Sequence, residues 1–158
     1  MNKVFCILCA FALAPSVQAQ QLDPGNIAQS QFAQVDADSN GRLDMAEQER
    51  FDSDMMISMD LDESGAADMD EFLAWGFGFS AVAEERGREA NYQTASRIIF
   101  SIMDYDDSGE VTLEEMNGFQ AAAFAYSDQD DDGELTPEEF HSHHFMNIAA
   151  QEALMPIQ

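Results

Sequence analysis

Residues 36–47 read DADSNGRLDMAE, and three later segments repeat this pattern without a gap: DLDESGAADMDE at 60–71, DYDDSGEVTLEE at 104–115 and DQDDDGELTPEE at 128–139. We name these segments loops 1 to 4. Each has aspartate at positions 1 and 3, asparagine, serine or aspartate at position 5, glycine at 6 and glutamate at 12. An acidic composition alone does not produce four such matches in register, so the repeat decides how the chain is interpreted.

The pattern places oxygen atoms where a calcium ion needs them. Ca²⁺ prefers about six to eight oxygen ligands, and a twelve-residue loop supplies them from positions 1, 3, 5, 7, 9 and 12, with position 7 using its backbone carbonyl. The predicted metal ligands are Asp36, Asp38, Asn40, Arg42, Asp44 and Glu47 in loop 1; Asp60, Asp62, Ser64, Ala66, Asp68 and Glu71 in loop 2; Asp104, Asp106, Ser108, Glu110, Thr112 and Glu115 in loop 3; and Asp128, Asp130, Asp132, Glu134, Thr136 and Glu139 in loop 4.

Helices are predicted on both sides of each loop. Thr112 with Glu115 and Thr136 with Glu139 have the spacing of a capping box, and Asp44 and Asp68 can cap in the same way. Apolar residues flank the loops at helical spacing. They are Phe32, Val35, Phe51, Met56, Met59, Phe72, Trp75, Phe100, Met103, Met116, Phe119, Phe124, Phe140 and Phe145, although Ser127 interrupts the series before loop 4.

Together these motifs make residues 28–147 resemble the EF-hand superfamily of calmodulin-like calcium-binding proteins. The resemblance implies an all-α fold, built from two pairs of EF-hand helix–loop–helix units with short inter-loop strands. It also implies calcium as the cofactor, with up to four ions bound. Position 8 contributes to the inter-loop strand, and loop 2 departs from the usual branched residue there because it has Ala67.

The spacing of the loops leaves their pairing open. Only residues 48–59 separate loops 1 and 2, and only residues 116–127 separate loops 3 and 4. We expect each connection to be two short helices with a tight turn, which would place Leu43 opposite Ala67 and Val111 opposite Leu135. The expected units are then residues 20–80 and 81–158, or one compact domain. The alternatives are one straight helix in each connection, and a pairing of loop 2 with loop 3.

The N-terminus is typical of an exported protein. Residues 1–19 have the basic residue, short apolar run and small-residue cleavage site of a signal peptide; an uncleaved anchor or a buried helix is the alternative. Both cysteines, Cys6 and Cys9, fall in this segment, and no Asn-x-Ser/Thr acceptor site follows it. These features predict a periplasmic or secreted protein, more typical of bacteria than of eukaryotes.

The charge narrows the range of partners. The chain has a formal net charge of −25 at pH 7, which repels phosphate backbones and anionic lipid headgroups, so we expect no binding to nucleic acid or to membranes. The charge attracts cations instead. A hydrophobic fraction of 46% with 12 phenylalanines argues against a disordered acidic chain.

Three functions are consistent with these features. The first is a calcium buffer or a calcium-stabilised module. The alternative is a calcium-dependent adaptor that exposes a surface of methionine and phenylalanine to an unidentified protein partner. We expect Met56 and Met59 and the aromatic segment 75–79 to lie in the core instead. An enzyme is not expected, because no nucleophile–base arrangement is evident. His141, His143 and His144 could hold a transition metal only weakly, since a third firm ligand is missing.

Overall fold

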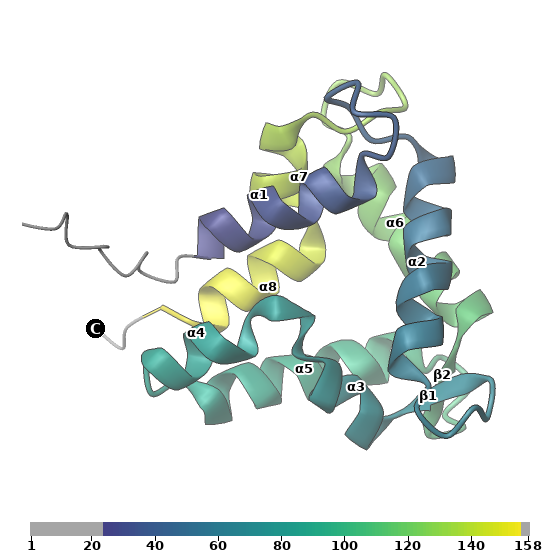
Figure 1. Ribbon diagram of the computed structural model, residues 1–158, viewed down its shortest axis with the longest axis vertical. Coiled ribbons are helices and arrows are strands. Elements are labelled where there is room, and N and C mark those ends of the chain that lie inside the picture. The colour runs from purple at the N-terminus through teal and green to yellow at the C-terminus, as the bar shows by residue number, and fades with distance from the viewer. Residues whose placement is uncertain (1–23, 156–158) are drawn as a thin grey trace, which may run out of the picture.

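The computed structural model describes residues 24–155, which form an all-α fold with one very small sheet (Figure 1). The expected signal peptide lies outside the described residues. The elements in chain order are α1 (Pro24–Val35), α2 (Met45–Met59), β1 (Ala66–Asp68), α3 (Met69–Trp75), the 3₁₀ turn η1 (Gly76–Gly78), α4 (Ser80–Glu85), α5 (Glu89–Met103), β2 (Glu110–Thr112), α6 (Leu113–Ser127), α7 (Pro137–His143) and α8 (Phe145–Ala153).

Helices α2 and α6 are each shared by two loops. Helix α2 leaves loop 1 and enters loop 2, while α6 leaves loop 3 and enters loop 4. The two helices pack against each other, with loops 1 and 4 at one end of the pair and loops 2 and 3 at the other (Figure 1). Each helix therefore connects one end of the molecule to the other.

The loops pair differently from our expectation. Ala67 lies opposite Val111 in an antiparallel contact between β1 and β2, so loop 2 pairs with loop 3. Leu43 lies opposite Leu135, with N–O distances of 2.9 and 2.8 Å, so loop 1 pairs with loop 4. The expected pairs of Leu43 with Ala67 and of Val111 with Leu135 are wrong. Each pair joins a loop from residues 20–80 to one from residues 81–158.

The continuity of α2 and α6 explains this correction. A capping box at Asp44 starts α2, and no glycine or proline interrupts the 15 residues that follow. A helix of this length is roughly 22 Å long, whereas paired strands lie only about 4.8 Å apart. Loops at opposite ends of one straight helix cannot pair with each other. Gly118 does not break α6, which also continues for 15 residues.

Two apolar clusters form the core around the two loop pairs. One surrounds loops 1 and 4 and includes Phe32, Val35, Leu43, Phe124, Leu135 and Phe140. The other surrounds loops 2 and 3 and includes Met55, Met56, Met59, Phe72, Phe100, Met103, Val111 and Met116. Phe51 of α2 packs against both clusters. Burial of Met56 and Met59 confirms their predicted core positions, and Met55 is buried beside them.

The long connection between loops 2 and 3 breaks after α3, as its glycines predict. Gly76 has a left-handed φ of 62° at the end of α3, and a Cβ there would lie 2.7 Å from the Ser80 hydroxyl oxygen. The Tyr92 hydroxyl donates to the Gly76 carbonyl at 2.7 Å, and burial raises the pKa of Tyr92 to about 12. Phe79 is buried in a third cluster with Tyr92, whereas Trp75 is partly exposed. In the part of the chain that the structure describes, no helix has the length and apolar character needed to cross a membrane.

Candidate calcium-binding loops

The first aspartate of every loop organises the backbone that follows it. In loop 2, Asp60 Oδ2 accepts a hydrogen bond from Gly65 N at 2.8 Å, and its Oδ1 accepts one from Ser64 N at 2.9 Å. Loops 1, 3 and 4 repeat both contacts at 2.9–3.1 Å, from Asp36, Asp104 and Asp128. Four segments that lie far apart in the sequence therefore fold around their first carboxylate in the same way.

These contacts hold the loop backbone in a tightly turned conformation. The residue at position 4 has a left-handed φ near 60° in every loop, as in Glu63, although none of these residues is glycine. Position 6 also requires positive φ, which reaches 98° at Gly65. No atom lies within 4 Å of a Cβ built at Gly65, so the requirement for glycine there is conformational and not steric.

The glutamate at position 12 returns from the exiting helix to the start of its loop. Glu47 Oε1 accepts from Ala37 N at 2.8 Å and from Asp38 N at 3.2 Å, and Glu47 Oε2 accepts from Asp44 N at 3.2 Å. The side chain of Asp44 accepts in return from Glu47 N at 2.8 Å. This reciprocal capping box is present in all four loops and confirms the predicted helix starts.

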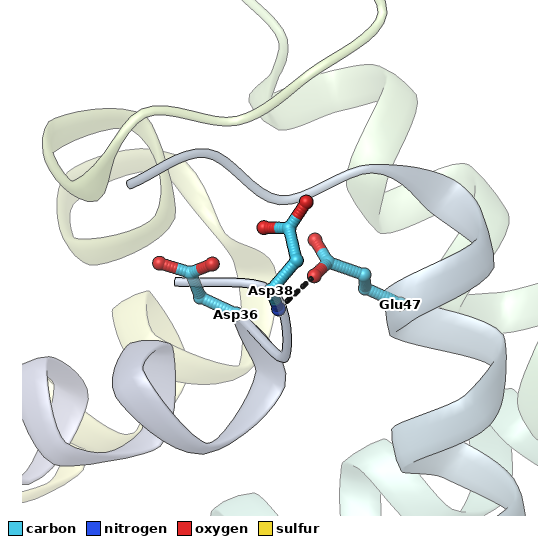
Figure 2. A group of neighbouring side chains, drawn as sticks. All are labelled: Asp36, Asp38 and Glu47. Atoms are coloured by element: carbon cyan, nitrogen blue, oxygen red, sulfur yellow. Dashed lines mark hydrogen bonds between the residues drawn. The ribbon is translucent and has the colours of Figure 1, made fainter. Parts of the chain in front are cut away.

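The glutamate and two aspartates of each loop converge. One ligand atom from each of the three carboxylates lies within 4.8 Å of the others in every loop. Figure 2 shows this arrangement in loop 1, where Asp36, Asp38 and Glu47 gather from the end of α1, the loop and the start of α2. The twelve carboxylates brought together in this way are Asp36, Asp38, Glu47, Asp60, Asp62, Glu71, Asp104, Asp106, Glu115, Asp128, Asp130 and Glu139.

The remaining predicted ligands complete the loops in other roles. The Ser64 hydroxyl donates to the Ala66 carbonyl at 3.0 Å, and Ser108 makes the same contact with Glu110 at 3.1 Å. Asn40 Oδ1 accepts from Arg42 N at 2.7 Å, and Asp132 Oδ1 accepts from Glu134 N at 3.0 Å. All four position-9 residues serve as helix N-caps: Asp44, Asp68, Thr112 and Thr136. Their roles as metal ligands stay predictions.

Loop 3 contains a buried carboxylate oxygen that has no hydrogen-bond partner. Glu115 is buried, and its Oε1 has no hydrogen-bond partner, although Oε2 accepts from Thr112 N at 2.8 Å. The carboxylate of Glu114, with smaller contributions from Glu115 and Asp106, raises the pKa of nearby Tyr105. A buried, unpartnered carboxylate oxygen in a field of negative charge is chemically suited to a hard cation.

One arginine links two of the loops. Arg42 of loop 1 forms an ion pair with Asp132 of loop 4 at 2.8 Å, and its Nε lies 3.9 Å from Glu134. Hydrogen bonds from the Thr136 backbone N–H and hydroxyl lower the pKa of Glu139. Within residues 24–155 no other ion pair is formed, so most of the loop carboxylates have no cationic side chain to balance them.

The histidines do not join these groups. Within the described residues, every cluster with metal-binding spacing consists of aspartate and glutamate alone. His144 is buried with its ring 5.0 Å from that of Phe140, and burial lowers its pKa to about 4. Sequence reasoning had missed this burial, although His144 stands four residues after the core residue Phe140.

Comparison with known families agrees with the loop geometry. The family model described as EF hand matches three segments, residues 27–52, 97–120 and 119–146, which contain loops 1, 3 and 4. These matches and the four carboxylate clusters support placing the chain in the EF-hand superfamily. Loop 2 lies outside the matched segments but has the same anchors, cap and convergence. No curated protein matches the chain.

Proposed function

We propose that the protein is an exported calcium-binding protein that holds up to four Ca²⁺ ions, one in each loop. The observation that carries the proposal is the convergence of three carboxylates in each loop, with ligand atoms within 4.8 Å of one another. Every convergent ligand is an oxygen atom, which suits calcium better than softer metals. Export rests on the signal-like composition of residues 1–19.

The proposed role is that of a calcium buffer or a calcium-stabilised module without catalytic activity. Carboxylates held this close repel one another, and a bound divalent cation would remove that repulsion. A ligand that binds only the folded state stabilises it in proportion to the logarithm of the ligand concentration above Kd. Calcium would therefore contribute directly to folding, as it does for other metal sites that form only in the folded chain.

Isothermal calorimetry tests this proposal. We expect calcium to bind at about four sites per chain in the presence of millimolar magnesium, since magnesium needs a more rigid, octahedral site. Micromolar or tighter binding would favour a buffer or a switch, whereas binding only near millimolar would favour a structural role. The absence of heat of binding, with no change in thermal stability on chelation, would contradict the proposal.

Single substitutions at position 12 sharpen the test. Glu139→Gln keeps the size of the side chain and removes one charge from loop 4, and we expect it to weaken or abolish that site. Glu138→Gln is a matched control, because Glu138 is the exposed neighbour on the same helical turn. Equal effects of the two substitutions would show that bulk charge, and not ligation, determines calcium binding.

A second candidate function is an adaptor, favoured by one apolar groove. A groove of about 590 Å³ lies between α5, α6 and α8 and is lined by Ile102, Phe119, Ala122, Ala123, Tyr126, Phe145 and Ile148. Ile102 and Tyr126 are at least half exposed. The net charge of −25 disfavours a second copy of the chain and favours an apolar segment flanked by basic residues.

A hydrophobic dye distinguishes the two functions. An adaptor should bind more dye when calcium is added, and Tyr126→Ser with Ile102→Ser should reduce that signal. A buffer or structural module should bind less dye when loaded, because calcium tightens its fold. The matched control is Ile57→Ser, since Ile57 is an exposed isoleucine of α2 that does not line the groove.

A further inference from the structure

A polar seam crosses the otherwise apolar contact between α2 and α6. It consists of Gln48 and Asp52 of α2 and Gln120 of α6, all of which are buried, with Asp52 fully inaccessible to solvent. Gln48 and Asp52 are four residues apart and lie on the same side of α2 as Met55 and Met59. The seam therefore lies in the middle of the two helices that connect the loop pairs.

Most oxygen atoms of the seam have no hydrogen-bond partner. Gln48 Nε2 donates to Asp52 Oδ1 at 2.9 Å. Three oxygens remain without a partner: Gln48 Oε1, Asp52 Oδ2 and Gln120 Oε1. Buried acceptors without donors are unfavourable, and an ionised carboxylate in this position would be the least favourable of all. A proton on Oδ2 would turn one of the three acceptors into a donor for another.

Within residues 24–155, no basic side chain forms an ion pair with Asp52. The charged group that acts on Asp52 is Glu49, which is itself acidic, and α1 contains no ionisable side chain. Elements β1 and α3 place Asp68, Asp70 and Glu71 in loop 2, at the end of α2. Helix α6 places Glu114 and Glu115 at its start, in loop 3. The group that faces Asp52 from α6 is the uncharged side chain of Gln120.

The electrostatic environment of Asp52 also favours its protonated form. Burial, with a smaller contribution from Glu49, raises the pKa of Asp52 to about 7, although the amide groups of Gln48 and Gln120 offset part of this effect. Gln120 makes no hydrogen bond of good geometry to Oδ2. A small cavity of about 40 Å³ adjoins the seam and is lined by Gln48, Gln120 and His144. His144, also buried, has its own pKa lowered to about 4 and is neutral where Asp52 titrates.

We propose that Asp52 is a proton-binding site, in which the neutral carboxylic acid donates its Oδ2 proton to a glutamine carbonyl oxygen of the seam. Loss of the proton leaves a buried negative charge between α2 and α6 that no cationic side chain balances, and so weakens the contact between these two helices. The packing of the two halves of the molecule thereby responds to pH near neutrality. This site is separate from the calcium loops, and the proposal does not depend on whether those loops bind calcium.

Carboxyl carbon NMR of the intact protein, labelled with ¹³C at its aspartates, tests the proposal. We expect the Asp52 signal to titrate with a midpoint near 7, whereas the ordinary value is 3.8. This difference corresponds to roughly a thousandfold lower proton dissociation constant. The signal is assigned through its backbone connectivity in the unmodified protein, so the test requires no variant. A midpoint at or below 4 would overturn the proposal.

Unfolding measurements on variants provide a second test. A pKa raised in the folded state contributes stability that is present below the unfolded pKa and is lost as pH rises through the folded pKa. Between pH 5 and pH 8 the folding equilibrium constant of the unmodified protein should fall by about a hundredfold more than that of Asp52→Asn. Asp54→Asn is the matched control, because Asp54 is exposed on the same helix. Identical pH profiles for Asp52→Asn and the unmodified protein would contradict the proposal.

Discussion

The guanidinium group of Arg42 lies 2.8 Å from the carboxylate of Asp132, so a residue of the first loop contacts an expected calcium ligand of the fourth. Both side chains remain more than a third exposed. The ion pair therefore adds little to stability, in the range of about 0–1 kcal/mol for exposed pairs. Its effect on calcium is of more interest, because the arginine and the ion would compete for the same oxygen atoms.

We expect Arg42→Gln to increase calcium affinity at loop 4, by at most about fivefold, which corresponds to about 1 kcal/mol. Calorimetric titration of the variant measures this change. Arg50→Gln is the control, because it removes the same charge from an exposed position on α2. An equal gain in both variants would assign the effect to net charge, and a loss of affinity in Arg42→Gln would contradict the competition.

The loop pairing makes a prediction about which sites are coupled. Val111→Ala shortens the residue opposite Ala67, which is fully buried, and should cost roughly 2 kcal/mol of unfolding free energy. Calcium binding at loops 2 and 3 should weaken together, while loop 4 changes less. Site-resolved NMR titration follows each loop separately. Leu135→Ala is the reciprocal variant and should weaken calcium binding at loops 1 and 4. Coupled calcium binding at loops 3 and 4 would contradict the observed pairing.

Two glycine substitutions should have opposite effects although both positions have open space around them. Gly65 has a φ of 98°, and Gly65→Ala should destabilise loop 2 by about 1–2 kcal/mol because an L-residue is strained there. Gly118 is helical, and Gly118→Ala should stabilise the protein by about 0.5–1 kcal/mol. Urea unfolding of both variants tests the pair. Destabilisation of similar size in both would show that volume, and not backbone conformation, is limiting.

His144 should make the fold sensitive to acid. Burial lowers its pKa from 6.5 to about 4, so its contribution to stability is present above the unfolded pKa and is lost as pH falls through the folded pKa. The loss between about pH 6.5 and pH 4 corresponds to roughly 3 kcal/mol. His144→Gln should lose less stability than the unmodified protein over this range in chemical unfolding. The control is His141→Gln, because His141 is only partly buried.

The sequence predicted each binding loop more completely than it predicted how the loops meet. In each loop the residues at positions 1, 6 and 12 determine the local conformation. The aspartate accepts hydrogen bonds from the loop backbone, the glycine permits positive φ, and the glutamate completes a capping box that starts the next helix. These interactions all lie within one twelve-residue loop. The pairing of Leu43 with Leu135 depends on the whole path of α2 and α6, and assuming that neighbouring loops pair gave the wrong partners.

The α2 part of the polar seam could also have been predicted from the sequence. Gln48 and Asp52 occur at the same helical spacing as Met55 and Met59, so a polar pair at core positions was visible in the sequence. Its partner Gln120 belongs to a different repeat and could not be assigned without the packing of α2 on α6. The apolar groove shows the same limit, because its walls come from three helices that no single motif relates.

The contact between the first and last loops has a consequence for how the chain reaches its native state. Arg42 and Asp132 are 90 residues apart, and a polypeptide is made and delivered from one end. Loop 1 therefore remains without its partner until loop 4 has emerged, while loops 2 and 3 can already join. Contacts between distant parts of a chain form slowly, so we expect the outer pair to close last. Before that closure we expect loop 1 of one chain to be able to pair with loop 4 of another, the exchange between molecules that is typical of repeat proteins.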